Sequence, residues 1–281
     1  LIQCAAPTFI KPFFGKRWDI PSDATVMLVD HAAEDGVVIS RALHPHLADL
    51  DTYHATACSL DEAVRRIVAV GGRHDRVAAL DNFCWPDPVL SPLTPDGSYK
   101  LAQLVRANQA LYDTCIALDL PLISGKDSMK NDSTRSGKKV SIPPTLLISA
   151  ISRTDDVRRC VTLEAKKAGD VVYVVGITRA ELGGSELAWM LNDREGVNDP
   201  GLSRYPGDRD TPPRIGGEVP KLQVELARDI YSAVEAAIAD GLLRSVHAPG
   251  LGGLATGLAM IAMGGEFGLD LYTAVSYTHL R

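Results

Sequence analysis

Apolar and polar residues follow two different periods along this chain, and the periods predict strands and helices in turn. Short apolar runs predict strands at residues 26–29, 37–39, 77–80, 120–123, 145–151 and 171–175. Apolar residues at steps of three and four predict long helices over residues 101–118 and 222–238. This mixture of elements predicts an α+β fold.

A capping pattern predicts the start of another helix at Ser59. Ser59 and Glu62 have the spacing of N-cap and N3 in a capping box, and Gly71 and Gly72 would end the helix. Arg66 follows Glu62 by four residues, which is the spacing of an ion pair on one helix face. Glu62 therefore has a structural explanation of its own.

The chain divides where charge rises, over residues 155–169. We expect an irregular, proline- and aromatic-rich lead-in at residues 1–24, a first unit at 25–154 and a second unit at 155–281. In the second unit, residues 182–187 predict a glycine turn into a helix, and residues 246–254 predict a strand end, a glycine turn and a helix start. The tail at 276–281 does not continue the pattern before it, and the chain does not begin with methionine. We therefore expect a piece of a longer protein with an incomplete second unit.

Composition narrows the class of protein. A hydrophobic content of 46% with 23% charged residues is typical of a globular protein with a sizeable core. The net charge of −6 argues against a nucleic-acid binder, and no apolar run reaches the ~18 residues that span a membrane. Five cysteines without C-x-x-C spacing argue against disulfides or a structural zinc site and favour a cytoplasmic location. His44 and His46 have the His-x-His spacing of a metal-chelating pair, and His54 follows. The sequence assigns no third ligand to the pair, so solvated loop histidines are the simpler interpretation.

The strongest candidate for chemistry is the segment at residues 120–132. We expect a buried strand that ends at Ser124 and Gly125 and presents Lys126, Asp127 and Ser128 together. Lysine offers charge to phosphate, aspartate can hold a metal, and serine can donate a hydrogen bond, so the group suits a phosphorylated ligand. The alternative is an ordinary polar turn. The segment is not a Walker A loop, which requires another glycine and a Ser/Thr after the lysine. Residues 129–139 are polar and predict a mobile loop.

A second candidate follows the strand at 77–80. Asp81, Asn82 and Trp85 are typical of the rim of a site, and equally of a proline-bounded turn.

Taken together, these segments resemble the second half of the phosphoribosylformylglycinamidine synthase family, also called formylglycinamide ribonucleotide amidotransferase. The matching segments, in order, are residues 61–66, 80–85, 122–128, 146–150, 181–185 and 252–254. The resemblance implies a fold like that of aminoimidazole ribonucleotide synthetase, with two α+β domains. It also implies a missing N-terminal synthetase half that faces this one.

The resemblance implies an ATP-dependent ligase of purine biosynthesis. Such enzymes convert formylglycinamide ribonucleotide and glutamine-derived ammonia to formylglycinamidine ribonucleotide, with ADP and phosphate as products. The expected cofactors are ATP and Mg²⁺, and the expected partners are the missing half and a glutaminase domain or subunit. We expect the segment alone to be inactive.

The resemblance also implies roles for individual residues. Gly125 and Asp81 would contact ATP, Lys126 and Asp127 would be catalytic, and Ser128 would contact the substrate.

A further nucleotide site of the family looks degraded in this chain. Glu62 keeps one metal-binding position there, whereas Ala42, Arg66, Ala248 and Gly250 replace expected ligands. The resemblance therefore implies a Glu62–Arg66 ion pair in place of a metal.

Two other functions stay open. A different synthetase or kinase of the same superfamily is disfavoured by residues 81–85. A non-catalytic scaffold half is supported by the degraded second site.

Overall fold

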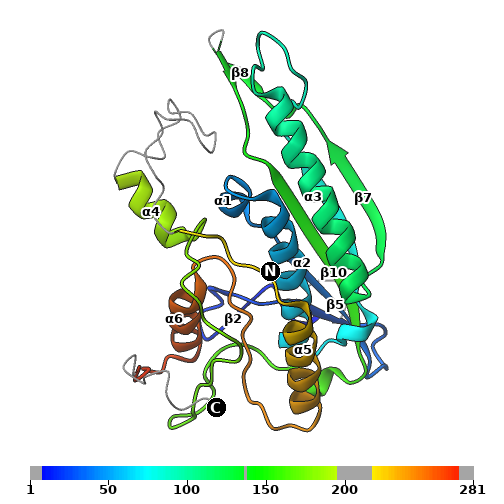
Figure 1. Ribbon diagram of the computed structural model, residues 1–281. Helices are drawn as coiled ribbons and strands as arrows, with labels where there is room; N and C mark the ends of the chain where they lie inside the picture. The colour runs from blue at the N-terminus through cyan, green and yellow to red at the C-terminus, as the bar shows by residue number, and fades with distance from the viewer. Residues whose placement is uncertain (1–7, 136–137, 195–216, 272–281) are drawn as a thin grey trace.

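A six-stranded sheet forms the centre of the computed structural model, which describes residues 8–135, 138–194 and 217–271 (Figure 1). In spatial order, the strands are β1 (Thr8–Ile10), β4 (Thr25–Leu28), β5 (Gly36–Ala42), β10 (Thr145–Thr154), β6 (Ala78–Cys84) and β7 (Leu122–Ser128). The pairing of β6 with β7 is parallel, and the other pairings in this sheet are antiparallel. The strands predicted within residues 26–39, 77–80 and 145–151 are thus confirmed, and the fold is α+β.

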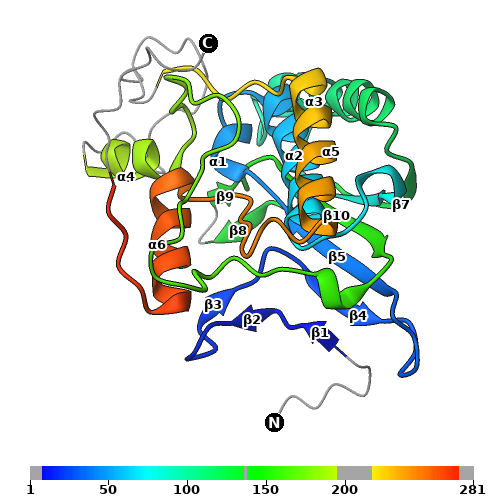
Figure 2. The same ribbon diagram turned by 90° about the horizontal axis from the view of Figure 1, so that it is seen from below.

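One face of this sheet is covered by helices (Figure 2). Helix α2 (Thr52–Ala69) packs on β5 and β10, and α3 (Gly97–Leu118) and α5 (Val224–Ala239) pack on α2. The core between the layers includes Leu60, Ile67, Val38, Phe83 and Ile148. Burial of these apolar side chains is the main favourable term in folding. The long helices predicted at 101–118 and 222–238 are confirmed.

The other face of the sheet, which we call the open face, carries side chains that alternate with the buried ones. Along β5, Val38 and Ser40 are buried, whereas Ile39 and Arg41 are exposed. Because successive residues of a strand point to opposite sides, the partners of Ile39 across the sheet, such as Ile151, lie on the open face as well.

The predicted helix start at Ser59 is wrong. The helix begins seven residues earlier at Thr52, and the carboxylate of Asp51 caps it by accepting hydrogen bonds from the amides of Tyr53 and His54 at 2.9 and 3.1 Å. Ser59 lies inside α2 and donates to the carbonyl of Ala55 instead. An aspartate is as good an N-cap as a serine, and the earlier start extends the buried face by two turns.

Residues before 25 and after 128 are also more regular than expected. Strand β1 joins the central sheet, and β2 (Phe13–Phe14) pairs with β3 (Ile20–Pro21), so the predicted irregular lead-in holds three short strands. Strands β8 (Ser133–Arg135) and β9 (Lys138–Val140) form a hairpin where we expected a mobile loop.

The predicted strand at residues 171–175 is absent from the structure. The described residues offer no strand that pairs with it, and Val171 and Tyr173 are exposed. A strand needs a neighbour to satisfy its backbone groups, so apolar sequence alone does not make one. Near residue 246, the expected strand end is reduced to a single bridge between Thr162 and Ser245.

The helices of the second unit agree with expectation. Helices α4 (Glu186–Arg194) and α6 (Gly253–Gly265) follow the two glycine turns, and α6 packs near β2 and β3 through Met260 and Ile261. Helix α5 does not stay within a separate second unit, because Ala227 and Tyr231 join the core of the first. Cys4 and the tail at 276–281 lie outside the described residues.

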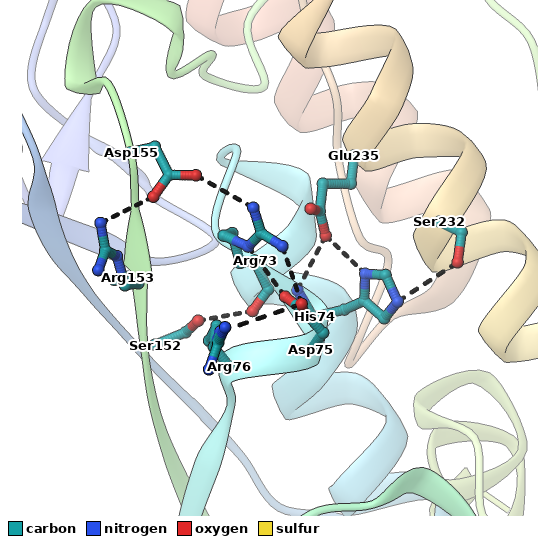
Figure 3. A network of polar contacts seen from close by, with 9 residues as sticks. All are labelled: Arg73, His74, Asp75, Arg76, Ser152, Arg153, Asp155, Ser232 and Glu235. Atoms are coloured by element: carbon teal, nitrogen blue, oxygen red, sulfur yellow. Dashed lines mark hydrogen bonds and ion pairs between the residues drawn. The ribbon is translucent and has the colours of Figure 1, made fainter.

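A polar clamp ties α5 to the turn before β6 (Figure 3). The carboxylate of Glu235 accepts from the backbone amide of His74 at 2.9 Å and lies 2.5 Å from Nδ1 of the same residue. The other ring nitrogen lies 3.3 Å from Oγ of Ser232, one turn earlier on α5. On the other side of the turn, Arg73 contacts Asp75 and Asp155. Two segments more than 150 residues apart are thereby joined.

We predict that Glu235→Gln lowers the free energy of unfolding by about 1–2 kcal/mol, because it weakens hydrogen bonds that a charged acceptor makes. Urea denaturation would measure the change. Asp229→Asn, on the exposed side of the same helix, is the matched control and should change stability by less than about 0.5 kcal/mol. Equal effects of the two substitutions would contradict the clamp.

Candidate functional site

The candidate site lies where the parallel strands β6 and β7 run side by side at one edge of the sheet (Figure 1). In their register Asp81 pairs with Gly125, and Asn82 pairs with Lys126. The strand predicted at 120–123 is in place but extends to Ser128, and most of it is exposed instead of buried. The expectation that the polar group follows the strand is therefore wrong, because these residues are part of the strand.

Because β7 continues through Lys126, Asp127 and Ser128, their side chains alternate between the two faces of the sheet. Lys126 and Ser128 point to the open face, as does Asn82 on β6, whereas Asp127 points to the helix side with Asp81. The sequence suggested a cation, a carboxylate and a hydroxyl presented together. The structure brings together the cation and the hydroxyl, and it places the carboxylate behind them.

On the open face, Nζ of Lys126 contacts Oγ of Ser128 directly. Lys126 is exposed, so its charge is available to a ligand. Beside it, Oδ1 of Asn82 is buried and has no hydrogen-bond partner among the described residues. A buried amide oxygen without a partner is costly, and a donor from a ligand would satisfy it. Together the three side chains offer a positive charge, a hydroxyl and an amide, which suit an anionic ligand with donor groups.

On the helix side, the carboxylate of Asp81 lies directly over Gly125. A Cβ at Gly125 would fall 2.4 Å from Oδ1 of Asp81, so a side chain at this position would displace the carboxylate. Burial raises the pKa of Asp81, and the nearby charge of Asp127 raises it further. Two carboxylates that repel each other in this way are a place where a cation would be stabilised.

A second ionic cluster, which the sequence did not point to, lies just beyond the ends of both strands. Nζ of Lys139 is 2.8 Å from Asp87 and 3.2 Å from Asp132, and it also donates to Thr94. The contact with Lys139 lowers the pKa of Asp87 to about 2. Asp87 follows the segment that we identified as a site rim, but Lys139 comes from the β8–β9 hairpin. Nothing in the spacing of these residues indicates that they meet.

Glu62 is far from this edge and does not fit a metal ligand. Its side chain is only 2% exposed, with Nη2 of Arg66 at 2.6 Å and Nε2 of His44 at 2.8 Å. Burial alone would raise the pKa of Glu62, but contact with His44 and the charge of Arg66 outweigh it and lower the pKa. The predicted Glu62–Arg66 pair is confirmed. His44 is buried against it, so the expectation of a solvated loop histidine is wrong for this residue.

The backbone of Gly250 lies close to the carboxylate of Glu62. A Cβ at Gly250 would lie 2.2 Å from Oε1 of Glu62 and 2.8 Å from Arg66, so the backbone of Gly250 closes one side. Within the part of the chain that the structure describes, no three His, Cys, Asp or Glu side chains gather as a metal site. In the same residues, no helix combines the length and the hydropathy needed to cross a membrane.

We predict that Gly125→Ala lowers the free energy of unfolding by about 1–3 kcal/mol, since the added methyl group overlaps the carboxylate of Asp81. Chemical denaturation measures this change, and Gly268→Ala is the control because nothing lies within 4 Å of its added Cβ. Adding Asp81→Ser should recover most of the loss. A loss that persists in the double variant would show that the overlap with Asp81 is not its cause.

The chain is similar in sequence to known proteins. A family model described as "AIR synthase related protein, C-terminal domain" matches residues 167–278. The chain is 30% identical over 264 residues to phosphoribosylformylglycinamidine synthase subunit PurL of Erythrobacter litoralis, covering 91% of this chain and 32% of that protein. The PurL subunit of Alkaliphilus metalliredigens is 28% identical over 247 residues, covering 88% of this chain and 29% of its own length. The chain thus spans about a third of the length of the curated relatives it matches.

The chain is also similar to solved structures, at lower identity. PurL of Thermotoga maritima complexed with AMPPCP has a TM-score of 0.44 and 24% identity, covering 58% of this chain and 24% of that one. Thiamine monophosphate kinase of Aquifex aeolicus has a TM-score of 0.42 and 14% identity, covering 74% of this chain and 59% of that one. In sequence the chain is thus similar to PurL subunits over most of its length, and residues 167–278 match the AIR-synthase-related C-terminal domain.

Proposed function

We propose that this chain is the second synthetase half of a phosphoribosylformylglycinamidine synthase. The complete enzyme would convert formylglycinamide ribonucleotide and glutamine-derived ammonia to formylglycinamidine ribonucleotide, with hydrolysis of ATP to ADP and phosphate. The similarity to PurL subunits over 91% of the chain supports this proposal. We further propose a cytoplasmic enzyme built from units at residues 25–154 and 155–281, and the family match that begins at residue 167 supports the second unit.

The observation that carries the proposal is the contact between Lys126 and Ser128 on the open face. Transfer of a phosphoryl group spreads negative charge over its oxygens, and fixed positive charge near them lowers the barrier. Lys126 would supply that charge, and Ser128 would donate a hydrogen bond to the ribonucleotide. Direct contact between their side chains holds both in one position before a ligand arrives. Asn82, with its unpaired oxygen, would accept a donor from the substrate.

Asp81 and Asp127 would face the nucleotide and its Mg²⁺ at the outer edge of β7. Magnesium prefers carboxylate and phosphate oxygens, and the carboxylate of Asp81 lies against Gly125 with the charge of Asp127 nearby. When bound, the metal would neutralise charge on the transferring phosphate. Burial and the charge of Asp127 raise the pKa of Asp81. A cation between the two carboxylates would offset their repulsion. Because β7 is an edge strand, a ligand along its free edge can reach both faces.

The open face of the sheet is also where the missing N-terminal half would pack. Apolar side chains such as Ile39 and Ile151 are about two-fifths exposed there, next to the polar site residues. A second half that packed here would bury these apolar side chains while completing the site. Ammonia would come from a glutaminase domain or subunit.

We predict that Lys126→Ala in the full-length protein lowers kcat/KM for formylglycinamidine ribonucleotide formation by about 10²-fold or more. The loss corresponds to about 3 kcal/mol of transition-state stabilisation. Steady-state kinetics with ammonia as the nitrogen source would test this without involving the glutaminase. Lys167→Ala, an exposed lysine outside the site, is the control.

Three results would contradict the proposal. Unchanged kinetics of the Lys126→Ala protein would exclude the role of Lys126. A full-length protein that binds the ribonucleotide but forms no product, with or without Lys126, would favour a non-catalytic scaffold. Turnover of another phosphorylated substrate in place of formylglycinamide ribonucleotide would favour a different synthetase or kinase.

We also predict that no magnesium nucleotide is bound at Glu62. Its one carboxylate is already occupied by Arg66 and His44, and Mg²⁺ needs several oxygen ligands in near-octahedral geometry. Purification without added nucleotide, denaturation and analysis of the supernatant would check this. Stoichiometric ADP and magnesium that survive Asp81→Asn but disappear with Glu62→Gln would contradict it.

A further inference from the structure

The candidate site ends in a turn at residues 128–132, which contacts from outside β7 hold in place. The carbonyl oxygen of Ser128 accepts hydrogen bonds from the backbone amide of Trp85 at 2.8 Å and from the side-chain amide of Asn131 at 3.1 Å. The backbone amide of Asn131 donates to the carbonyl of Trp85 at 3.1 Å. Trp85 is only 1% exposed, and its ring N–H donates to the carbonyl of Lys100. One side of the turn is therefore anchored in the core.

The same turn contains a backbone conformation that its sequence does not favour. Lys130 has a φ of 59°, in the left-handed region where a residue with a Cβ is strained. Such a conformation persists only where the surrounding contacts determine it. The turn therefore needs contacts at its far end as well as those made by Trp85.

Lys139 supplies contacts at the far end, from the β8–β9 hairpin. Its Nζ lies 2.8 Å from Oδ2 of Asp87 and 3.2 Å from Oδ2 of Asp132. It also donates to the hydroxyl of Thr94 at 2.7 Å. The same oxygen of Asp132 accepts from the backbone amide of Asp87 at 3.1 Å. The turn is thus joined to the segment after β6 by a backbone hydrogen bond and by a shared cation.

The cation matters because the two carboxylates that it joins have little access to water. The side chain of Asp132 is 4% exposed and that of Asp87 is 14% exposed. Carboxylates in such surroundings repel each other strongly when no cation lies between them, since water screens them little. The ammonium group of Lys130 is farther away, at 3.7 Å from Asp87, and its side chain is 59% exposed. Without Lys139, we expect residues 129–132 to move away from the segment after β6.

We propose that Lys139 is a positioning residue for the reaction, because it holds the turn that fixes Ser128 at the end of β7. Among the described residues, no hydrogen bond or ion pair joins its ammonium group to Lys126 or Ser128. We therefore expect Lys139 to act through the turn and not on a ligand. The inference rests on the proposed function, in which Ser128 contacts the ribonucleotide.

A double-mutant cycle in the full-length protein tests this route. Lys139→Ala should lower kcat/KM for formylglycinamidine ribonucleotide formation by about tenfold, because Ser128 would no longer be held in place. When Ser128→Ala is already present, the same substitution should lower kcat/KM by less than about threefold. A residue that only stabilises the fold would have the same effect in both backgrounds. Equal losses in the two backgrounds, or no loss in either, would overturn the proposal.

Two further variants serve as controls. Lys139→Arg keeps a cation between the carboxylates and should retain kcat/KM within about threefold of the unsubstituted protein. Lys16→Ala should leave kcat/KM unchanged, because Lys16 forms its ion pair elsewhere, with Glu266 at 3.0 Å, and lies between β2 and β3. A loss with Lys139→Arg as large as that with Lys139→Ala would show that the charge of Lys139 does not hold the turn, and would also overturn the proposal.

Amide hydrogen exchange tests the turn without an assay of activity. In Lys139→Ala, exchange at the amides of Asn131 and Asp87, which donate across the turn, should become about tenfold faster or more. Lys16→Ala should change neither rate. Unchanged exchange in Lys139→Ala would overturn the proposal. Faster exchange in a full-length protein that forms no formylglycinamidine ribonucleotide would refute the proposed function instead, and would leave Lys139 as the residue that holds the turn.

Discussion

The register between β6 and the edge strand β7 is the constraint on which the candidate site depends. It sets Asp81 against Gly125 and Asn82 against Lys126, and strand alternation then decides which side chains share a face. A slip of one residue would move Lys126 and Ser128 to the helix side and expose Asp127 in their place. A Cβ opposite Asp81 would displace its carboxylate, so glycine at position 125 favours the observed register. The same glycine thereby supports the division of charge between the two faces.

The two carboxylates Glu62 and Asp81 show how environment changes what a residue can do. Glu62 is buried against the imidazole of His44 and the guanidinium of Arg66, and these contacts lower its pKa. Asp81 is partly buried without a cation, so its pKa is raised and its charge is uncompensated. Glu62 therefore stabilises the junction of α2 with residue 250, whereas Asp81 is the one that gains from binding a positive ion.

Local patterns predicted the elements better than they predicted the site. The period of α3 and the apolar runs of β5 and β10 were sufficient to predict these elements, because burial on one face requires apolar residues at regular positions in the sequence. Two predictions of secondary structure were wrong because the outcome depends on tertiary contacts. The apolar run at 171–175 has no described neighbour to pair with, and β7 extends through Lys126 because β6 continues beside it. The meeting of Asp87 with Lys139 depends on a hairpin that folds back, which no spacing along the chain encodes.

Two surfaces of this chain expose apolar side chains, and they differ in the polar groups beside them. The open face combines moderate apolar exposure with a lysine, a hydroxyl and an unpaired amide, so whatever covers it must also carry polar groups that complete a site. The outer side of α3 exposes Leu101, Val105, Tyr112 and Ile116, with the polar residues Asn108 and Gln109 between them. The two surfaces therefore differ in the groups that a covering partner would have to supply.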